Sequence, residues 1–444
     1  MRLLWIKRAS WRRLIVFTSI VLWGSVSLAA NAAGLTLEET IGIAMRNNKD
    51  LQAARYVVKA ARARLLQAGL MPNPRLDLAR KSDSIFNNEG EYTTNIGLSQ
   101  QFPIAGRIAR QKDVAQTDVA LALAEINESE RKLAGEVAAS FYRILALDRQ
   151  IEVRDRLIGV DQKLSETTRN RFRAAEVSEL DVNTAQLELQ RLAQERALLL
   201  NQRVTEVAQL NQLLGQPATH PLALDNTLPA AEPLPNLMEA QQRALAQRPD
   251  MRLALLTADR ARADQALARA QRWEDWTAGV EVEQSRLAIQ GVPPQNRGRA
   301  LGLTLSIPLP LLNRNQGRIA EAAAAGAQAE TRIEALKLSI ENEVATAYAE
   351  AARLRTVVQQ YQQDILPLSD RNVRLAQQGY DQGLVSILEV VQAQRQQSEL
   401  NISYLNVLDQ YLQAIVKLRL ASGDYIADVT PPDQKPPYSE PKGK

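Results

Sequence analysis

The chain has no cysteine and a single histidine among its 444 residues. Without cysteine it cannot form disulfide bonds, bind a metal through thiolates or carry a lipid on an N-terminal cysteine. His220 precedes Pro221 in a segment with loop composition, which favours a solvated loop residue over a catalytic or metal-binding one. The methionines beyond Met1 are scattered and form no relay for metal ions: Met45, Met71, Met238 and Met251.

The chain also lacks the motifs of common catalytic sites. It contains no His-Glu-x-x-His zinc motif, no Gly-x-Ser-x-Gly nucleophile turn and no Gly-rich phosphate-binding loop that ends in Lys-Ser or Lys-Thr. Catalysis needs a constellation of such groups, and the sequence offers none. We therefore expect a protein that is not an enzyme and that uses neither a cofactor nor a resident metal.

Positive charge is concentrated at the N-terminus. The net charge is +4, and five arginine and lysine residues at the very start precede an apolar run from Leu14 to Leu28 and the small residues Ala30-Asn31-Ala32. This arrangement predicts a secretory signal peptide over residues 1–32, whereas Arg12-Arg13 and its surroundings match a twin-arginine signal poorly. The rest of the chain is nearly neutral, which argues against a nucleic-acid partner.

Beyond this leader no apolar run reaches the length of about 18 residues that a membrane-spanning helix needs. Alternation of apolar and polar residues instead predicts four strands, at about 75–80, 92–102, 276–284 and 300–308. Two strands of about ten residues joined by a polar loop have the length of a hairpin that crosses a bilayer. Any part of the chain within a membrane should therefore be strand.

Most of the remaining sequence has helical periodicity, which is interrupted between Gly379 and Glu389. Gly379 and Gly383 disfavour an unbroken helix through this segment. Ser386 and Glu389 have the spacing of a capping box, in which two side chains satisfy free amides at a helix start. The sequence therefore predicts a helical hairpin with its tip at about 379–389.

A weaker copy of this turn lies 208 positions earlier, where Ala175 corresponds to Gly383 and Ser178 corresponds to Ser386. The alanine replaces a glycine, so the first turn could be less tight than the second. This copy predicts a second helical hairpin in the same chain, with its tip at about 172–181.

Other motifs recur at similar offsets, and we therefore predict two structural repeats, 33–215 and 236–424. A Pro-rich linker at 216–235 joins them. The tail at 425–444 is rich in proline and lysine and is predicted to be disordered.

Each repeat is predicted to open with one continuous helix, at about 36–68 and 237–272. Much longer helices are expected at about 108–174 and 316–382, and Pro367 predicts a bend in the second of these. At about 1.5 Å per residue, such helices would extend for roughly 100 Å.

Four strands cannot close a barrel, and an open sheet in lipid would leave the polar groups of its edge strands unpaired. Three copies would supply twelve strands, which suits a bacterial barrel, and the helices would continue away from them. The predicted fold class is mainly α with a membrane β-barrel contribution: long α-helical hairpins and four strands per chain, in a trimer with a 12-stranded barrel and an α-helical tunnel. A coiled-coil scaffold would explain the helices but not the paired strands.

In this arrangement the chain resembles the outer-membrane factors of the TolC family over almost its whole length beyond the leader. The resemblance rests on the signal peptide, on the duplicated order of helices, strands and tips, and on the tip motifs. The stretch Ser306-Ile-Pro-Leu-Pro-Leu-Leu-Asn-Arg-Asn-Gln-Gly-Arg-Ile-Ala320 is similar to the cobalt-zinc-cadmium (heavy-metal) efflux branch of that family.

The resemblance implies a passive homotrimeric duct that lies in the lipid of the outer membrane of a Gram-negative bacterium and extends into the periplasm. Its tips would meet a periplasmic membrane-fusion (adaptor) protein and an RND-type inner-membrane efflux pump, and its solutes would be divalent heavy-metal cations. One alternative is a duct of the same family for drugs and other organic compounds. Another is a periplasmic helical adaptor protein, which would not need strands of lipid length.

The resemblance also implies roles for residues of the tips. Those implied in contact with the adaptor are Ala175, Val177, Ser178, Gly383, Leu384, Val385 and Ser386. Those implied in a gate at the periplasmic entrance are Asp181, Tyr380, Glu389 and Gln392. Asp181 and Glu389 also have the positions of capping residues, so capping alone and capping combined with gating remain as alternatives.

Overall fold

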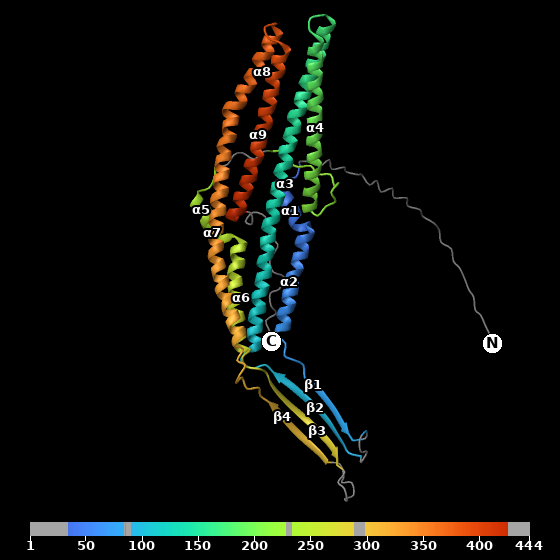
Figure 1. Ribbon diagram of the computed structural model, residues 1–444, viewed down its shortest axis with the longest axis vertical. Coiled ribbons are helices and arrows are strands. Elements are labelled where there is room, and N and C mark those ends of the chain that lie inside the picture. The colour runs from blue at the N-terminus through green and yellow to red at the C-terminus, as the bar shows by residue number, and fades with distance from the viewer. Residues whose placement is uncertain (1–33, 84, 86–89, 228–232, 288–297, 425–444) are drawn as a thin grey trace, which may run out of the picture.

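The computed structural model describes residues 34–83, 85, 90–227, 233–287 and 298–424. In this part of the chain, helices form a long, narrow body with a four-stranded sheet at one end and two helical tips at the other (Figure 1). The predicted signal peptide and C-terminal tail lie outside the described residues.

The two repeats contain the same order of helices and strands. The first consists of α1 (Leu37–Asn47), α2 (Lys49–Ala68), β1 (Arg75–Ser82), β2 (Tyr92–Phe102), α3 (Arg107–Arg173) and α4 (Glu179–Leu213). The second consists of α5 (Leu237–Gln247), α6 (Pro249–Ala270), β3 (Trp276–Arg286), β4 (Gly298–Ser306), α7 (Gln316–Gln360), a π-helix (Tyr361–Ile365), α8 (Leu366–Asp381) and α9 (Ile387–Ser422). All four strands overlap the ranges predicted from alternation.

Each repeat opens with two helices, whereas the sequence predicted one. Asn48 leaves the helical conformation at ψ 127°, and its side chain accepts a hydrogen bond from the amide of Leu51 at 2.9 Å, which starts α2. In the second repeat Pro249 fills the first position of α6 and holds Arg248 extended, because a proline ring clashes with a helical residue before it. The prediction of unbroken helices was therefore wrong in both repeats.

The five-residue π-helix ends at Ile365, two positions before Pro367, where the sequence predicted a bend. Proline has no amide hydrogen, and its ring clashes with the carbonyl four residues earlier, so regular α-helical bonding cannot pass through it. A wider π turn accommodates such an interruption without ending the helix.

The sheet combines strands from both repeats in the order β1-β2-β3-β4, with all neighbours antiparallel. The central pairing joins the repeats, since Ile96 and Leu98 of β2 lie opposite Val282 and Val280 of β3. Alternate residues of a strand point to opposite faces. One face of the sheet is therefore apolar, while the other carries small and polar residues such as Gly97.

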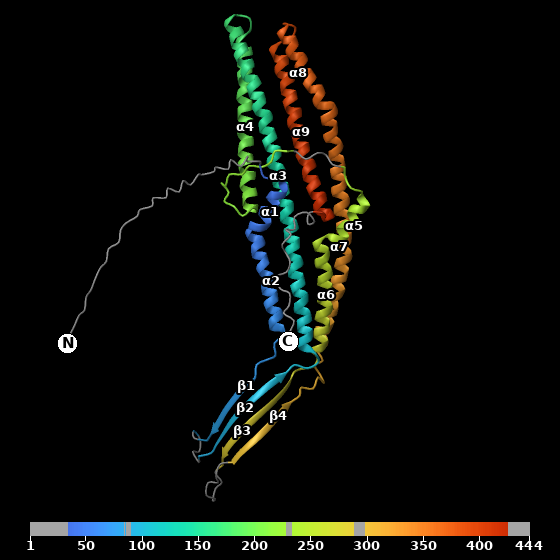
Figure 2. The same cartoon turned by 180° about the vertical axis from the view of Figure 1, so that it is seen from behind.

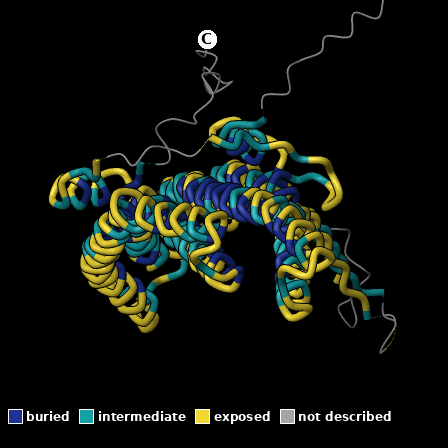
Figure 3. Tube along the Cα trace, turned by 90° about the horizontal axis from the view of Figure 1, so that it is seen from above, coloured by how far each residue is buried: buried dark blue, intermediate teal, exposed yellow. Residues whose placement is uncertain are grey.

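Helix α3 packs against helices of both repeats: α2, α4, α6 and α9 (Figures 1 and 2). The buried residues gather where the helices lie against one another (Figure 3). They are largely alanine, leucine, isoleucine and valine. Alanine permits close approach of neighbouring helices. No helix among the described residues is long and apolar enough to span a membrane.

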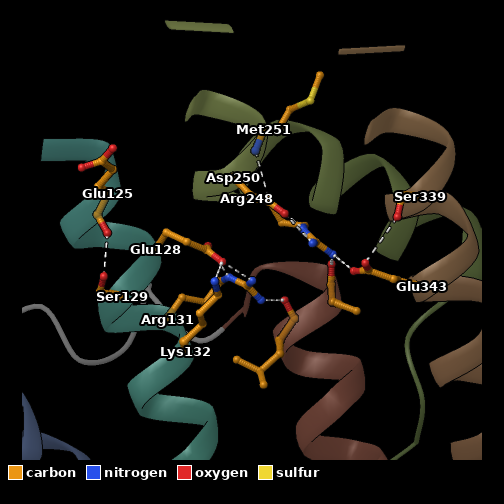
Figure 4. Close-up of polar contacts among 12 residues, drawn as sticks. Glu125, Glu128, Ser129, Arg131, Lys132, Arg248, Asp250, Met251, Ser339 and Glu343 are labelled. Atoms are coloured by element: carbon orange, nitrogen blue, oxygen red, sulfur yellow. Dashed lines mark hydrogen bonds and ion pairs between the residues drawn. The ribbon is translucent and has the colours of Figure 1, made fainter. Parts of the chain in front are cut away.

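Two arginines hold the C-terminal end of α9 (Figure 4). Arg131 of α3 donates to the carbonyl of Leu420 at 2.9 Å, and Arg248 donates to the carbonyl of Ala421 at 3.3 Å. Both side chains are less than a tenth exposed, and their positive charge also suits the negative end of the helix dipole. We call this pair of contacts the arginine clamp.

Acidic partners neutralise the arginine clamp. Glu128 binds Arg131 at 2.7 Å, while Asp250 and Glu343 bind Arg248 at 2.6 and 2.7 Å. Burial would raise the pKa of Asp250, but its hydrogen bonds to Arg248 and the positive charges of Arg248 and Arg131 together keep that pKa below its usual value. The clamp thus fixes α9 to both repeats midway along the molecule.

Candidate functional site at the helix tips

The two tips have the same backbone geometry. Ala175 and Gly383 both adopt left-handed conformations, with φ of 59° and 71°. The amide of the next residue, Glu176 or Leu384, donates to the carbonyl five positions earlier, at 2.9 and 2.8 Å respectively. This is the Schellman ending of a helix. The alanine therefore does not loosen the first turn, although a side chain is disfavoured in this conformation.

A capping residue starts the return helix at each tip. At the first tip the amide of Ser178 donates to the carboxylate of Asp181 at 2.9 Å, and the amide of Asp181 donates to the serine hydroxyl at 3.3 Å. At the second tip the amide of Ser386 donates to the carboxylate of Glu389 at 2.9 Å. Both acids thus act as caps, as their spacing indicated.

The tips expose several large apolar side chains. Leu384 is 74% exposed, and Leu180 and Leu388 at the starts of α4 and α9 are 72% and 50% exposed. Val177 and Val385 are half-buried beside them. A group of exposed apolar side chains at the end of a helical hairpin is typical of a surface that contacts another protein. The resemblance implied Leu384 as a residue in contact with the adaptor, but it did not imply Leu180 or Leu388. Each of these two leucines lies two positions after the capping serine of its tip.

Tyr380 lies inside the protein rather than at its surface. Its side chain packs with Leu164 of α3 and with Ile387 and Val390 of α9, and the guanidinium of Arg171 lies 4.5 Å from its ring centroid. The hydroxyl of Tyr380 is buried and has no hydrogen-bond partner among the described residues. The tyrosine therefore joins the two helical hairpins through apolar and cation–π contacts.

The other predicted gate residues are more accessible and are not brought together within one chain. Glu389 and Gln392 are exposed, and Asp181 is half-buried. In the described residues, Asp181 and Glu389 each bond to the serine of their own cap and not to each other. Any ring of acidic groups would therefore require more than one copy of the chain.

A buried ion pair between the hairpins was not predicted from the sequence. Arg395 of α9 donates to one carboxylate oxygen of Glu188 of α4 at 2.5 and 2.9 Å. Arg191 donates to the other oxygen at 2.5 Å. Glu188 is 6% exposed, and both arginines keep its pKa below the usual value against the opposing effect of burial.

The same layer contains a second link from α3 to its neighbours. Arg154 contacts Glu195 of α4 at 2.8 Å and donates to the hydroxyl of Ser398 of α9. No local spacing could reveal these contacts, because Ser398 lies 244 positions after Arg154 and Arg395 lies 207 after Glu188. Only the packing of α4 and α3 against α9 creates them.

Asp161 of α3 is buried next to this layer. Burial raises the pKa of Asp161 to about 6, and the negative charge of Glu188 adds to the rise, while Arg191 and Arg395 act against it. Its carboxylate therefore loses a proton at the expense of folded-state stability. The described residues include no group of three or more His, Cys, Asp or Glu side chains that could hold a metal ion.

Comparison with known proteins extends over both repeats. Residues 40–216 and 240–424 match the sequence family described as outer membrane efflux protein. The cobalt-zinc-cadmium resistance protein CzcC of Cupriavidus metallidurans is 25% identical over 389 residues, which cover 86% of this chain and 89% of CzcC.

Solved structures share the fold. The outer membrane protein VceC of Vibrio cholerae is similar with a TM-score of 0.68 at 18% identity, over 87% of this chain and 96% of that one. The MtrE outer membrane channel of Neisseria gonorrhoeae, in its open state, is similar with a TM-score of 0.69 at 20% identity, over 87% of this chain and 88% of that one. The predicted resemblance is therefore confirmed: the chain belongs to the outer membrane efflux protein family, whose members are efflux proteins of the outer membrane rather than enzymes.

Proposed function

We propose that this channel is the outer-membrane duct of a tripartite system that exports divalent heavy-metal cations. The observation that carries the proposal is the similarity to a cobalt-zinc-cadmium resistance protein over 86% of the chain, at 25% identity. The duct is passive, so the cations are selected by an inner-membrane pump of the RND type and handed on through a periplasmic adaptor.

The active unit is a homotrimer. The sheet of one chain has two open edges, β1 and β4. Unpaired backbone groups at such edges cost several kcal/mol each in lipid, so the edges must be covered by other strands. Pairing β4 of one copy with β1 of the next satisfies both edges, and three copies give a twelve-stranded barrel of ordinary size.

The tips dock onto the adaptor. Their paired Schellman turns, together with exposed Leu180, Leu384 and Leu388, give each chain two similar apolar contact points. The residues assigned to this contact are Ala175, Val177, Ser178, Gly383, Leu384, Val385 and Ser386. In a trimer they form six contact points around the periplasmic entrance.

Asp181, Tyr380, Glu389 and Gln392 narrow the entrance in the closed state. Three copies bring several carboxylates from Asp181 and Glu389 to one ring, and a ring of this kind attracts cations. Tyr380 contributes to the narrow entrance from inside the protein, because its side chain holds α8 and α9 against α3.

Metal tolerance tests the substrate. Deletion of the gene should sensitise the bacterium to zinc, cobalt or cadmium, and the chain supplied from a plasmid should restore tolerance. The Leu384→Asp variant should fail to restore it because a charge is placed in the adaptor contact. Leu198→Asp is the matched control, since Leu198 is 64% exposed on α4, about 30 Å from the tip.

Unchanged metal tolerance on deletion, with new sensitivity to organic compounds, would instead assign the duct to drug export. A trimer of Leu384→Asp that forms normally in the membrane, and that still restores tolerance, would contradict the role of the tip. A stable monomer with intact strands in detergent would contradict the trimer.

A further inference from the structure

The apolar face of the sheet consists of rows of residues that are paired across the four strands. Far from the helices lies a polar row, Arg80, Thr94, Gln284 and Arg299. Next toward the helices come two apolar rows. These rows are Leu78, Ile96, Val282 and Leu301, followed by Leu76, Leu98, Val280 and Leu303. All eight apolar side chains are close to half exposed or more in the single chain.

The apolar rows alone are short for a membrane. A strand rises about 3.3 Å per residue and tilts by about 40° in such barrels, so each residue adds about 2.5 Å of height. From the row of Ile96 to Phe102 at the end of β2, this face is therefore about 15 Å tall and includes one polar residue of β2, Gln100, whereas an outer-membrane apolar band is about 25 Å tall. Additional apolar surface is needed at the end next to the helices.

The connection between β4 and α7 supplies such surface. Leu309, Leu311 and Leu312 are 69%, 69% and 92% exposed. Leu309 lies three residues beyond the end of β4, so it adds apolar surface at the end of the sheet next to the helices.

This connection is longer than the change from strand to helix requires. In the first repeat only residues 103–106 separate β2 from α3, whereas residues 307–315 separate β4 from α7. The first repeat makes the transition with two left-handed residues, Ala105 and Gly106. The additional residues of the second repeat include the exposed leucines, so these leucines serve something other than chain connection.

Aromatic residues lie at the same end of the sheet. Phe102 pairs with Trp276, and both are exposed, as is Trp273 just before β3. Trp273 and Trp276 are the two tryptophans beyond the N-terminal 33 residues. Tryptophan at the border of an apolar band is typical of the interface between lipid and water.

We propose that the segment Leu309–Leu312 inserts into the periplasmic boundary of the outer-membrane lipid and anchors the channel there. This inference rests on the proposed insertion of the sheet in the membrane. The segment lies beyond the last paired residue of β4, Ser306, at the end of the sheet where Trp273 and Trp276 are exposed, so lipid rather than a second copy covers it. Arg314 follows, and its guanidinium donates to the carbonyl of Leu311 at 3.3 Å, at the level of the anionic headgroups.

The absence of cysteine makes the test direct. The Leu311→Cys variant is labelled with an environment-sensitive fluorophore and reconstituted as the full assembly in vesicles with brominated phospholipids, which quench on contact. Fluorescence should be lost at position 311. It should persist for Leu338→Cys, because Leu338 is 64% exposed on α7 but lies about 30 Å along the helix from the sheet.

The native tryptophans distinguish failure of this proposal from failure of sheet insertion. Quenched tryptophans with an unquenched label at position 311 would overturn the anchor and leave the membrane sheet intact. A label at position 311 that is not quenched but has a blue-shifted emission would also overturn the anchor. It would assign the segment to a contact between copies. If neither the tryptophans nor the label are quenched, the insertion of the sheet itself is contradicted.

A polar variant gives a second readout. Replacement of the three leucines together, Leu309→Ser, Leu311→Ser and Leu312→Ser, should make the trimer easier to extract from vesicles by urea at high pH. Leu338→Ser should leave extraction unchanged. Equal extraction of the triple variant and the unchanged protein would contradict the anchor.

Discussion

Ala175 and Gly383 occupy equivalent left-handed positions, with φ of 59° and 71°, in the two tips of one chain. Nothing lies within 4 Å of the position that a Cβ would take at Gly383, so an alanine there meets only backbone strain. That strain is about 1 kcal/mol or somewhat more. The two positions therefore form a reciprocal experiment.

Ala175→Gly should raise the midpoint of thermal unfolding and Gly383→Ala should lower it, each by the equivalent of about 1 kcal/mol. The gain for Ala175→Gly is reduced by the greater freedom of glycine in the unfolded chain. Circular dichroism of the purified channel measures both. Opposite signs at the two positions are the expected result, and equal destabilisation by both changes would contradict the equivalence of the turns.

Asp161 should make stability depend on pH. Its pKa is raised to about 6 in the folded protein from an ordinary value of 3.8, so the folded state binds the proton more tightly. Its contribution to stability is therefore complete below about pH 4 and is lost as the pH rises through 6. Allowing for partial solvent screening, the loss amounts to about 2 kcal/mol.

Asp161→Asn should stabilise the protein at pH 7 by about this amount and flatten the change between pH 4 and 6. Thermal unfolding at pH 4, 5, 6 and 7 measures both effects. Asp155→Asn is the control on the same helix, since Asp155 is 47% exposed and pairs with Arg196. A stability profile of Asp161→Asn that parallels the unchanged protein would exclude the raised pKa.

The ion pair between Glu188 and Arg395 should couple the two hairpins. Glu188→Gln leaves Arg191 and Arg395, which are 37% and 46% exposed, without their shared carboxylate and should cost about 2 kcal/mol. Arg395→Gln should cost less, because Arg395 is 46% exposed and Glu188 keeps Arg191. Unfolding of both single variants and the double variant gives their coupling energy. Simple additivity would show that the pair does not hold α4 to α9.

Glu389 should separate gating from capping. Glu389→Gln retains an oxygen for the amide of Ser386 but removes the charge, so single-channel recordings should show weaker cation preference at nearly unchanged thermal stability. Glu389→Ala removes both and should in addition cost about 1 kcal/mol. If Glu389→Gln leaves selectivity unchanged while Glu389→Ala lowers only stability, the residue is a cap alone.

Local patterns predicted the parts of the fold that depend on neighbouring residues. Alternation such as Leu301, Leu303 and Leu305 identified the strands, and the spacing of Ser386 and Glu389 identified a helix start. Both depend on interactions within a few positions. The family and the general arrangement of helices, strands and tips could accordingly be predicted.

Contacts between distant segments could not be predicted in this way. The break at Asn48 lies within a continuing helical pattern, and its side chain is held by the carbonyl of Leu213, 165 positions away. Similarly, the charges of Glu188 and Arg395 look like solvated helix residues until α4 and α9 meet. Tyr380 was placed at the gate by resemblance, but its burial against Leu164 depends on packing between the hairpins.

The arginine clamp fixes one end of α9, so a small rotation there displaces the other end, at the second tip, by a larger distance. Its 36 residues extend about 54 Å from the clamp to the second tip, so a rotation of about 5° at the clamp would carry the tip by about 5 Å. Arg395 lies about 38 Å along this arm from Leu420. A bond of given strength opposes rotation more effectively the farther it lies from the pivot. The ion pair with Glu188 therefore resists displacement of the tip with a torque that the same pair near the clamp could not supply.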